Sequence, residues 1–213
     1  MLELSHLATT LKHRLALPLP GREAQWRMAH AERKINLSRY KIPQDAKWGA
    51  VLILFYEEDY KVKIPLILRE SGGGVHSGQI SFPGGKYEKS DADISHTALR
   101  EAEEEINVAG GSVEILGRLT ELYIPPSNFL VHPFVGVTQA IPDFIPQPDE
   151  VVEVIPMALD DLLNDSLISE KEITLSNGLK ITTPYFDLNG HAVWGATAMM
   201  LSELKTILQE LSA

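Results

Sequence analysis

The sequence predicts an α+β fold, in which segments with helical spacing flank a series of short apolar segments. Leucines recur every three or four residues over 3–16, and residues 193–211 form another amphipathic stretch near the other end. Between them, apolar runs of strand length such as 50–56 are bounded by turn residues. With 213 residues, 44% of them hydrophobic, the chain can bury a sizeable core, and no turn-rich linker divides it. We therefore expect one domain.

The first elements follow from apolar spacing and from turn residues. We expect a helix over 3–16, which ends before two prolines, and a second short helix over 22–33. The apolar run 50–56 predicts a buried strand. A polar turn at 57–60 then leads into 63–69, which is expected to pair back as a second strand.

A short strand and a helix enclose the most distinctive part of the sequence. Residues 79–82 indicate a strand that leads into Pro83-Gly84, a pair that suits the central positions of a type II turn. Ser90 or Asp91 is expected to cap the next helix, which runs to about Ile106.

The second half of the chain continues with strands and closes with a helix. Strands are expected over 113–119, 129–138 and 149–154, and helices over 157–164 and 193–211. The loop Tyr123–Asn128 contains two adjacent prolines, and such a stiff loop is suited to border a substrate site. The pair Asn177-Gly178 is a strong hairpin signal between two further β-type segments.

A row of carboxylates lies on the helix that follows the Gly-Gly turn. Glu101, Glu104 and Glu105 stand at i, i+3 and i+4, so their side chains share one helix face. Like charges at this spacing repel each other, and a hard divalent cation such as Mg²⁺ would remove the repulsion. Arg100 is placed to pair with Glu104 one turn away. The spacing indicates a metal-binding face, whereas a solvated acidic face is the simpler explanation of an isolated acidic run.

This segment resembles the Nudix box, whose family pattern is G-x5-E-x7-R-E-U-x-E-E-x-G-U, where U is a bulky apolar residue. The resemblance runs from Gly85 through Arg100 to Val108. Asp91 replaces the first glutamate of the pattern, one residue is inserted before Arg100, and Asn107 replaces the closing glycine. The arginine and all three helix carboxylates are intact.

The resemblance implies a Nudix-type α/β/α sandwich with a mixed central sheet and extra N- and C-terminal helices. One domain would span 1–213. Residues 1–45 would form an N-terminal helical extension packed on a core of about 46–165, and residues 166–213 would add a hairpin and the C-terminal helix.

A second signature resembles the coenzyme A diphosphatase branch of this family. It comprises 66–68, 78–85 and the form of the helix at 97–102, and the residue inserted before Arg100 also appears in that branch. That branch usually carries an arginine four residues before the glycine of its upstream motif, where this chain has Gly74. Arg69 lies nearby in sequence as a candidate substitute.

The resemblance implies metal-dependent hydrolysis of a pyrophosphate bond in coenzyme A or its derivatives, giving 4′-phosphopantetheine and 3′,5′-ADP. Gly74 favours an alternative, in which a Nudix hydrolase acts on another nucleoside diphosphate derivative such as ADP-ribose or a dinucleotide. A third hypothesis is a non-catalytic nucleotide-binding Nudix module, which would be expected to have lost helix carboxylates that this chain retains.

The resemblance also implies roles for individual residues. Those expected to bind Mg²⁺ or Mn²⁺ are Glu101, Glu104 and Glu105. Those expected to be catalytic are Glu101, Glu104 and Arg100. Those expected to bind substrate are Gly84, Gly85, Lys86 and Arg69. The general base lies either in the helix row or in a later segment, where Glu150 and Glu153 are candidates.

Charge and composition narrow the classes of partner. The net charge of −10 argues against broad nucleic-acid binding, and it requires metal ions, with Lys86 as a helper, to attract an anionic nucleotide. The absence of cysteine excludes disulfides and thiolate nucleophiles. The start of the chain lacks the pattern of a signal peptide, and no apolar run could span a bilayer. We therefore expect a cytoplasmic protein without a membrane partner, and a homodimer is left open.

Overall fold

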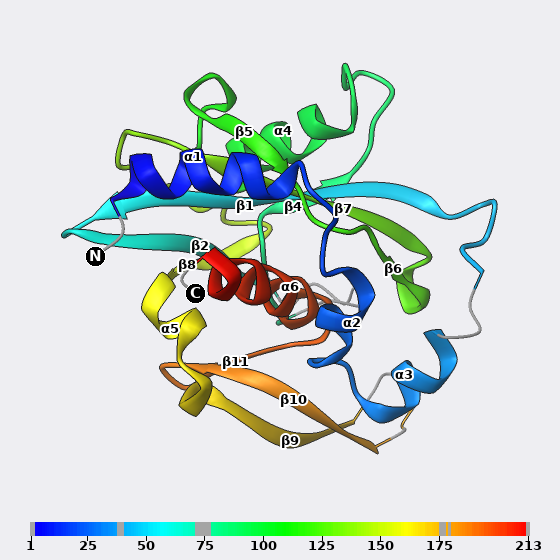
Figure 1. Cartoon of the computed structure of the whole chain (residues 1–213). Coiled ribbons are helices and arrows are strands. Elements are labelled where there is room, and N and C mark those ends of the chain that lie inside the picture. Colours follow the sequence, from blue (N-terminus) through cyan, green and yellow to red (C-terminus); the bar gives the residue numbers. More distant parts are fainter. Residues whose placement is uncertain (1–2, 38–40, 71–77, 175–177, 179, 212–213) are drawn as a thin grey trace.

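A mixed β-sheet lies between helices on both of its faces. The structure is a computed structural model, and the residues that it describes are 3–37, 41–70, 78–174, 178 and 180–211. In Figure 1, α1 (Leu4–Leu15) lies across the near face of the sheet, whereas α4 (Ile94–Ile106) lies behind it. The helix α6 (Gly195–Leu211) shares a hydrophobic core with α1. This arrangement confirms the predicted sandwich with helices added at both ends.

The central sheet follows the order β3-β2-β1-β7-β5 among the described residues, with β4 also paired to β1, β6 to β7 and β8 to β2. Its strands are β1 (Lys47–Glu58), β2 (Lys61–Arg69), β3 (Ile80–Ser81), β4 (Gly84–Lys86), β5 (Glu114–Arg118), β6 (Leu122–Ile124), β7 (Phe129–Val137) and β8 (Val151–Ala158). The strands β1 and β7 run parallel and the other pairs run antiparallel, so the sheet is mixed as predicted.

A second, smaller sheet follows, with the order β11-β10-β9. Its strands are β9 (Ile168–Thr174), β10 (Lys180–Leu188) and β11 (His191–Trp194). The remaining helices are α2 (Gly21–Trp26), α3 (Ala31–Leu37) and α5 (Leu159–Leu163), with 3-10 turns at Gly110–Ser112, Pro125–Ser127 and Asp165–Leu167. None of the helices described is long and apolar enough to cross a bilayer.

Alternation along β1 divides the interior into two cores. Ile53 and Phe55 face the core that contains α1 and α6. Leu52 and Leu54 point to the opposite face and pack in the core that contains α4. Because successive side chains of a strand point to opposite faces, this fully apolar segment is buried on both sides.

The buried carboxylate of Glu203 joins the N-terminal extension to α6 and to the sheet. Its oxygens accept hydrogen bonds from the Gln25 amide at 2.9 Å, from the Thr120 hydroxyl at 2.7 Å and from the Gly21 N–H at 3.1 Å. Such contacts support the predicted single domain over 1–213, which stays a prediction.

The predicted helix over 22–33 is wrong, because two shorter helices take its place. The helix α2 ends at Trp26, and α3 begins at Ala31. Between them, the imidazole Nδ1 of His30 accepts a hydrogen bond from the Arg33 N–H at 3.2 Å. The histidine therefore caps a new helix, which apolar spacing alone does not reveal.

The predicted type II turn at Pro83-Gly84 is also wrong. The φ of Gly84 is 155°, whereas the second central residue of such a turn needs a φ of about +80°. Gly84 instead belongs to β4 and pairs with Val51. A Cβ at Gly84 would overlap the carbonyl oxygen of Ala50. The glycine is therefore required because two backbones approach closely.

The last helix begins two residues later than predicted. The strands β9 and β10 pair antiparallel as the hairpin signal predicts, although Asn177 lies outside the described residues. Val193 and Trp194 belong to β11, which pairs with β10, and Gly195 starts α6 with a φ of +66°. The sequence did not predict β11, because a strand of four residues is too short to establish a periodicity.

Candidate active site

The helix α4 is capped by Asp93 rather than by the predicted Ser90 or Asp91. The Asp93 carboxylate accepts hydrogen bonds from the N–H groups of Ser95 (2.8 Å) and His96 (3.0 Å), which satisfies two free donors of the first turn. Asp91 has a different task, because its side chain is buried and faces the middle of the helix.

The other end of α4 explains one departure from the family pattern. Asn107 follows the helix with φ 61° and ψ 32°, the left-handed conformation that commonly ends a helix. Glycine adopts this conformation without strain, and asparagine is the side chain that most often replaces it there. The replacement of the closing glycine by Asn107 therefore leaves the geometry of the helix end unchanged.

Asp91 anchors Arg100 to the base of the site. The guanidinium donates from Nε to Asp91 Oδ1 at 2.8 Å and from Nη2 to Oδ2 at 3.2 Å. The Thr97 hydroxyl (2.8 Å) and the Glu88 N–H (3.0 Å) also donate to Asp91 Oδ2. These hydrogen bonds, above all those from Arg100, hold the pKa of Asp91 well below its usual range.

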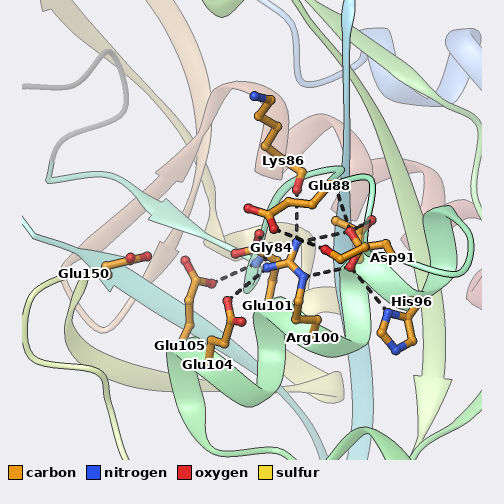
Figure 2. Close-up of polar contacts among 12 residues, drawn as sticks. Gly84, Lys86, Glu88, Asp91, His96, Arg100, Glu101, Glu104, Glu105 and Glu150 are labelled. Atoms are coloured by element: carbon orange, nitrogen blue, oxygen red, sulfur yellow. Dashed lines mark hydrogen bonds and ion pairs between the residues drawn. The ribbon is translucent and has the colours of Figure 1, made fainter.

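Arg100 connects the carboxylate row to β4, as Figure 2 shows. Its Nη1 lies 3.0 Å from Glu104 Oε2, which is the predicted i, i+4 pair, and 2.9 Å from Glu101 Oε1. Its Nη2 donates to the backbone carbonyl of Lys86 at 3.1 Å. The Lys86 amine itself points away from the carboxylates in Figure 2.

Glu105 is the most buried of the three helix carboxylates, with 1% of the residue exposed. Its Oε2 accepts a hydrogen bond from the Gly84 N–H, and its Oε1 accepts one from Arg69 Nη1, both at 2.8 Å. Burial raises the pKa of Glu105 to about 7, although Arg69 and Gly84 oppose this shift. Arg69 was predicted as a substrate-binding residue, and the structure adds a second role beside Glu105.

Glu101 lies against the glycine turn. Burial raises the pKa of its carboxyl group, and Arg100 acts in the opposite direction. Any side chain at Gly85 would overlap the Glu101 carboxylate, so the glycine leaves room for that group beside the backbone of β4. The structure thus brings together Gly85, Glu101 and Arg100, three residues of the segment that resembles the Nudix box.

The three helix carboxylates are suitable donors for a hard cation. All are oxygen ligands, and burial raises the pKa of Glu101 and of Glu105, so nearby positive charge would stabilise their ionised forms. In the part of the chain that the structure describes, no three acidic or histidine side chains gather into a cation site. Arg69 and Arg100 instead hold Glu105 and Glu104 in ion pairs.

A cavity of about 880 Å³ opens beside β4. All four residues predicted to bind substrate line it: Arg69, Gly84, Gly85 and Lys86. The proline loop also borders it, as predicted, through Pro125, Pro126 and Ser127. Arg33, Arg69 and Lys86 contribute positive charge to its described walls, which contain no aspartate or glutamate. The acidic chain therefore presents a locally cationic cavity.

Several residues in the cavity wall were missed by the sequence analysis. His30 and Arg33 come from the N-terminal extension, Trp194 comes from β11, and Gly195 to Thr197 come from the start of α6. A lone arginine on a short helix carries no signal that the sequence analysis could recognise. Gly74, which bears on the substrate, lies outside the described residues.

Of the two later candidates for a general base, only Glu150 approaches the carboxylate row. Its Oε2 lies 3.9 Å from Arg69 Nη2, so Arg69 stands between Glu150 and Glu105. The charge of Glu150 also contributes to the raised pKa of Glu101. Glu153 is an exposed residue of β8, where it pairs with Leu68.

Comparisons with known sequences agree with this geometry. A family model described as NUDIX domain matches residues 46–176, which is more than half of the chain. The human protein named mitochondrial coenzyme A diphosphatase NUDT8 is 35% identical over 128 residues, or 60% of this chain and 54% of that protein. Nudix hydrolase 15, mitochondrial, from Arabidopsis thaliana is 34% identical over 171 residues, or 77% of this chain and 59% of that protein. The chain thus spans less than two thirds of either relative.

Solved structures share the fold. A MutT/nudix family protein from Enterococcus faecalis superposes with a TM-score of 0.50 at 14% identity, covering 92% of this chain and 75% of that one. The M. smegmatis Nudix hydrolase RenU gives a TM-score of 0.51 at 11% identity, covering 78% of this chain and 88% of that one. At such identities the likeness concerns the path of the chain, not the substrate.

Proposed function

This chain belongs to the Nudix family, and we propose that it hydrolyses the pyrophosphate bond of coenzyme A or its derivatives, giving 4′-phosphopantetheine and 3′,5′-ADP. The choice of coenzyme A as the substrate is based on the sequence signature in 66–68 and 78–85, which resembles the coenzyme A branch. It is further supported by the 35% identity to a human protein that is named a coenzyme A diphosphatase.

One observation supports the proposed chemistry: the strand β4 contacts both the carboxylates of α4 and a cationic cavity. Glu105 accepts a hydrogen bond from the Gly84 N–H on one side of this strand, while Gly84, Gly85 and Lys86 line the cavity. An anionic substrate in the cavity would therefore lie near the carboxylate row of α4 without meeting an acidic wall.

Glu101, Glu104 and Glu105 are the residues that we propose as ligands for Mg²⁺ or Mn²⁺. A bound divalent cation would neutralise charge on the phosphate oxygens and lower the pKa of an attacking water. Arg100 positions Glu101 and Glu104 by direct contacts, and Asp91 in turn fixes Arg100.

The remaining residues have separate tasks in the proposed reaction. Arg69 and Lys86 bind phosphate oxygens, because both are cations in the cavity wall. Gly84 and Gly85 allow substrate to approach the backbone. Glu150 takes the proton from the attacking water, since Arg69 links it to the carboxylate row.

A second candidate function keeps the chemistry and changes the substrate to ADP-ribose or a dinucleotide. The observation that favours it is Gly74, which stands where the coenzyme A branch usually has an arginine. Both candidates share a nucleoside diphosphate, so the comparison between substrates decides between them.

The test is product analysis of the purified protein with Mg²⁺ and, in parallel, coenzyme A, ADP-ribose and a dinucleotide. Glu105→Gln serves as the inactive control. We expect 3′,5′-ADP from coenzyme A with the native protein and none with the variant. Turnover of only the other substrates would replace the proposed substrate, and turnover of none would reject hydrolase activity on these compounds.

The cytoplasmic location and the absence of a nucleic-acid partner stay predictions from the sequence, and a homodimer stays an open possibility. Two relatives carry the word mitochondrial in their names, so a localisation experiment is needed for the first of these.

A further inference from the structure

The cavity extends beyond the catalytic carboxylates to walls built by the two terminal parts of the chain. His30 and Arg33 line it from the N-terminal extension, and Gly195 and Ala196 line it from the first turn of α6. In Figure 1, the end of α6 that follows β11 lies on the side of α2 and α3. This part of the cavity is lined by none of the three helix carboxylates.

Arg33 brings to this wall a positive charge that no carboxylate of the described residues neutralises. Its Nη2 donates to the backbone carbonyl of Tyr123 at 3.2 Å, whereas its buried Nε has no hydrogen-bond partner. No ion pair involves Arg33 among the described residues. Burial lowers the pKa of this guanidinium to about 10, so it stays charged at neutral pH. In a chain of net charge −10, a half-buried cation with no acidic partner among the described residues is suited to an anionic ligand.

The start of α6 adds a second, independent source of positive potential. The helix has 17 residues and no acidic side chain in its first turn. The first N–H groups of a helix have no partner within it, and the helix dipole places positive charge at this end. Gly195 and Ala196 lie in the cavity wall, so this end borders the same space as Arg33.

We propose that Arg33 and the first turn of α6 form a subsite for a phosphate monoester that the substrate carries apart from its pyrophosphate. The inference rests on the proposed function, because coenzyme A has such a group on its ribose, the 3′-phosphate that remains in 3′,5′-ADP. ADP-ribose and 3′-dephospho-coenzyme A lack it. The subsite thus gives the chain a means of preferring coenzyme A that does not involve Gly74.

The first experiment compares the hydrolysis of coenzyme A and of 3′-dephospho-coenzyme A by Arg33→Gln. A hydrogen bond between charged groups is worth enough that its loss raises KM by about ten- to a hundredfold. We expect this rise for coenzyme A and no change for the dephospho compound. Arg27→Gln is the matched control, because Arg27 is an exposed arginine of the same extension that lies outside the cavity wall. Arg27→Gln should leave KM unchanged for both substrates.

Two further variants separate the subsite from a loss of folding. Arg33→Lys keeps the charge and should restore part of the preference for coenzyme A. Ala196→Asp adds a carboxylate to the first turn of α6, where an acidic side chain stabilises a helix but repels a phosphate. We expect Ala196→Asp to keep a cooperative thermal unfolding transition and to lose the preference for coenzyme A.

A binding measurement keeps the inference independent of catalysis. Calorimetric titration without metal should give tighter binding of 3′,5′-ADP than of 5′-AMP, and Arg33→Gln should remove the difference. Equal binding of the two nucleotides by the native protein would overturn the subsite. So would an equal rise in KM for coenzyme A and 3′-dephospho-coenzyme A in Arg33→Gln. If the native protein binds 3′,5′-ADP through Arg33 but hydrolyses no coenzyme A, the proposed function fails and the subsite stands.

Discussion

Asp91 and Arg100 are nine positions apart in the chain and meet through two hydrogen bonds, of 2.8 Å to Oδ1 and 3.2 Å to Oδ2. The aspartate side chain is buried, and the arginine also contacts two of the three helix carboxylates. Asp91 thereby determines where Arg100 lies, and Arg100 in turn determines where Glu101 and Glu104 lie.

Asp91→Asn should therefore reduce both stability and activity. Removal of one partner leaves a largely buried arginine without its main counter-charge, so the free energy of unfolding should fall by about 2 kcal/mol. Urea denaturation measures this change. Glu114→Gln is the control, because it breaks an exposed ion pair with Lys12 that is worth about 0.5 kcal/mol. Equal small effects of both substitutions would contradict the anchoring role of Asp91.

The same pair should make stability sensitive to acid. The folded pKa of Asp91 lies below its unfolded value of about 3.9, chiefly because Arg100 binds the ionised form. Its stabilisation is thus complete above the unfolded pKa and is lost as the pH falls through the folded pKa. Urea denaturation at several pH values should show a constant difference between native protein and Asp91→Asn from about pH 7 to 5, and a shrinking one below about pH 4. A difference that persists unchanged in acid would argue against this ion pair.

Gly85→Ala should abolish most activity while it spares the fold. The added Cβ would displace the Glu101 carboxylate, which is the movable end of a long side chain, so little stability is lost. We expect kcat to fall by about a hundredfold, since a displaced catalytic group commonly costs that much. Gly111→Ala is the control, because a Cβ there would meet no atom within 4 Å. Normal activity of Gly85→Ala would show that Glu101 is dispensable.

Glu150→Gln should lower kcat and leave KM unchanged. A general base contributes about a hundred- to ten-thousandfold to the rate, and glutamine cannot accept the proton from water. Glu153→Gln is the matched control, because Glu153 is an exposed residue of β8, three positions further along the chain, and the variant should behave as the native protein does. Steady-state kinetics with saturating coenzyme A distinguish the two. A small effect of Glu150→Gln would place the base in the helix row.

Arg69→Gln should lower kcat/KM by the same factor for all candidate substrates, in contrast to Arg33→Gln. Arg69 contacts Glu105 and lines the cavity beside β4, so its loss affects the pyrophosphate that every candidate substrate shares. We expect kcat/KM to fall by about ten- to a hundredfold for coenzyme A and for its dephospho form. Selectivity between these two, measured as the ratio of kcat/KM values, should not change. A selective loss would assign Arg69 to the monoester instead.

The sequence predicted the carboxylate row because helical spacing is a local property. Glu101, Glu104 and Glu105 occupy one face by periodicity alone, and Arg100 reaches Glu104 within one turn. The central strands were predictable for the same reason, since the apolar run at 50–56 is continuous. Such signals lie within a few residues of one another.

Other parts of the site depend on contacts between distant segments and left no local signal. Asp91 is of a residue type that commonly caps helices, and only the folded structure shows that its side chain binds Arg100 instead. Arg33 reaches the carbonyl of Tyr123, 90 positions away, before it can line the cavity. Gly84 follows a proline and therefore resembles a turn residue, although it pairs with β1.

The bonds that Glu203 makes with Gly21, Gln25 and Thr120 have a consequence for how such a protein can diverge. They fasten the terminal segments to the sheet at a point outside the carboxylate helix. Mutations in those segments can reshape one wall of the cavity while the carboxylate helix stays unchanged. Substrate range and chemistry are thereby free to evolve at different speeds within one chain.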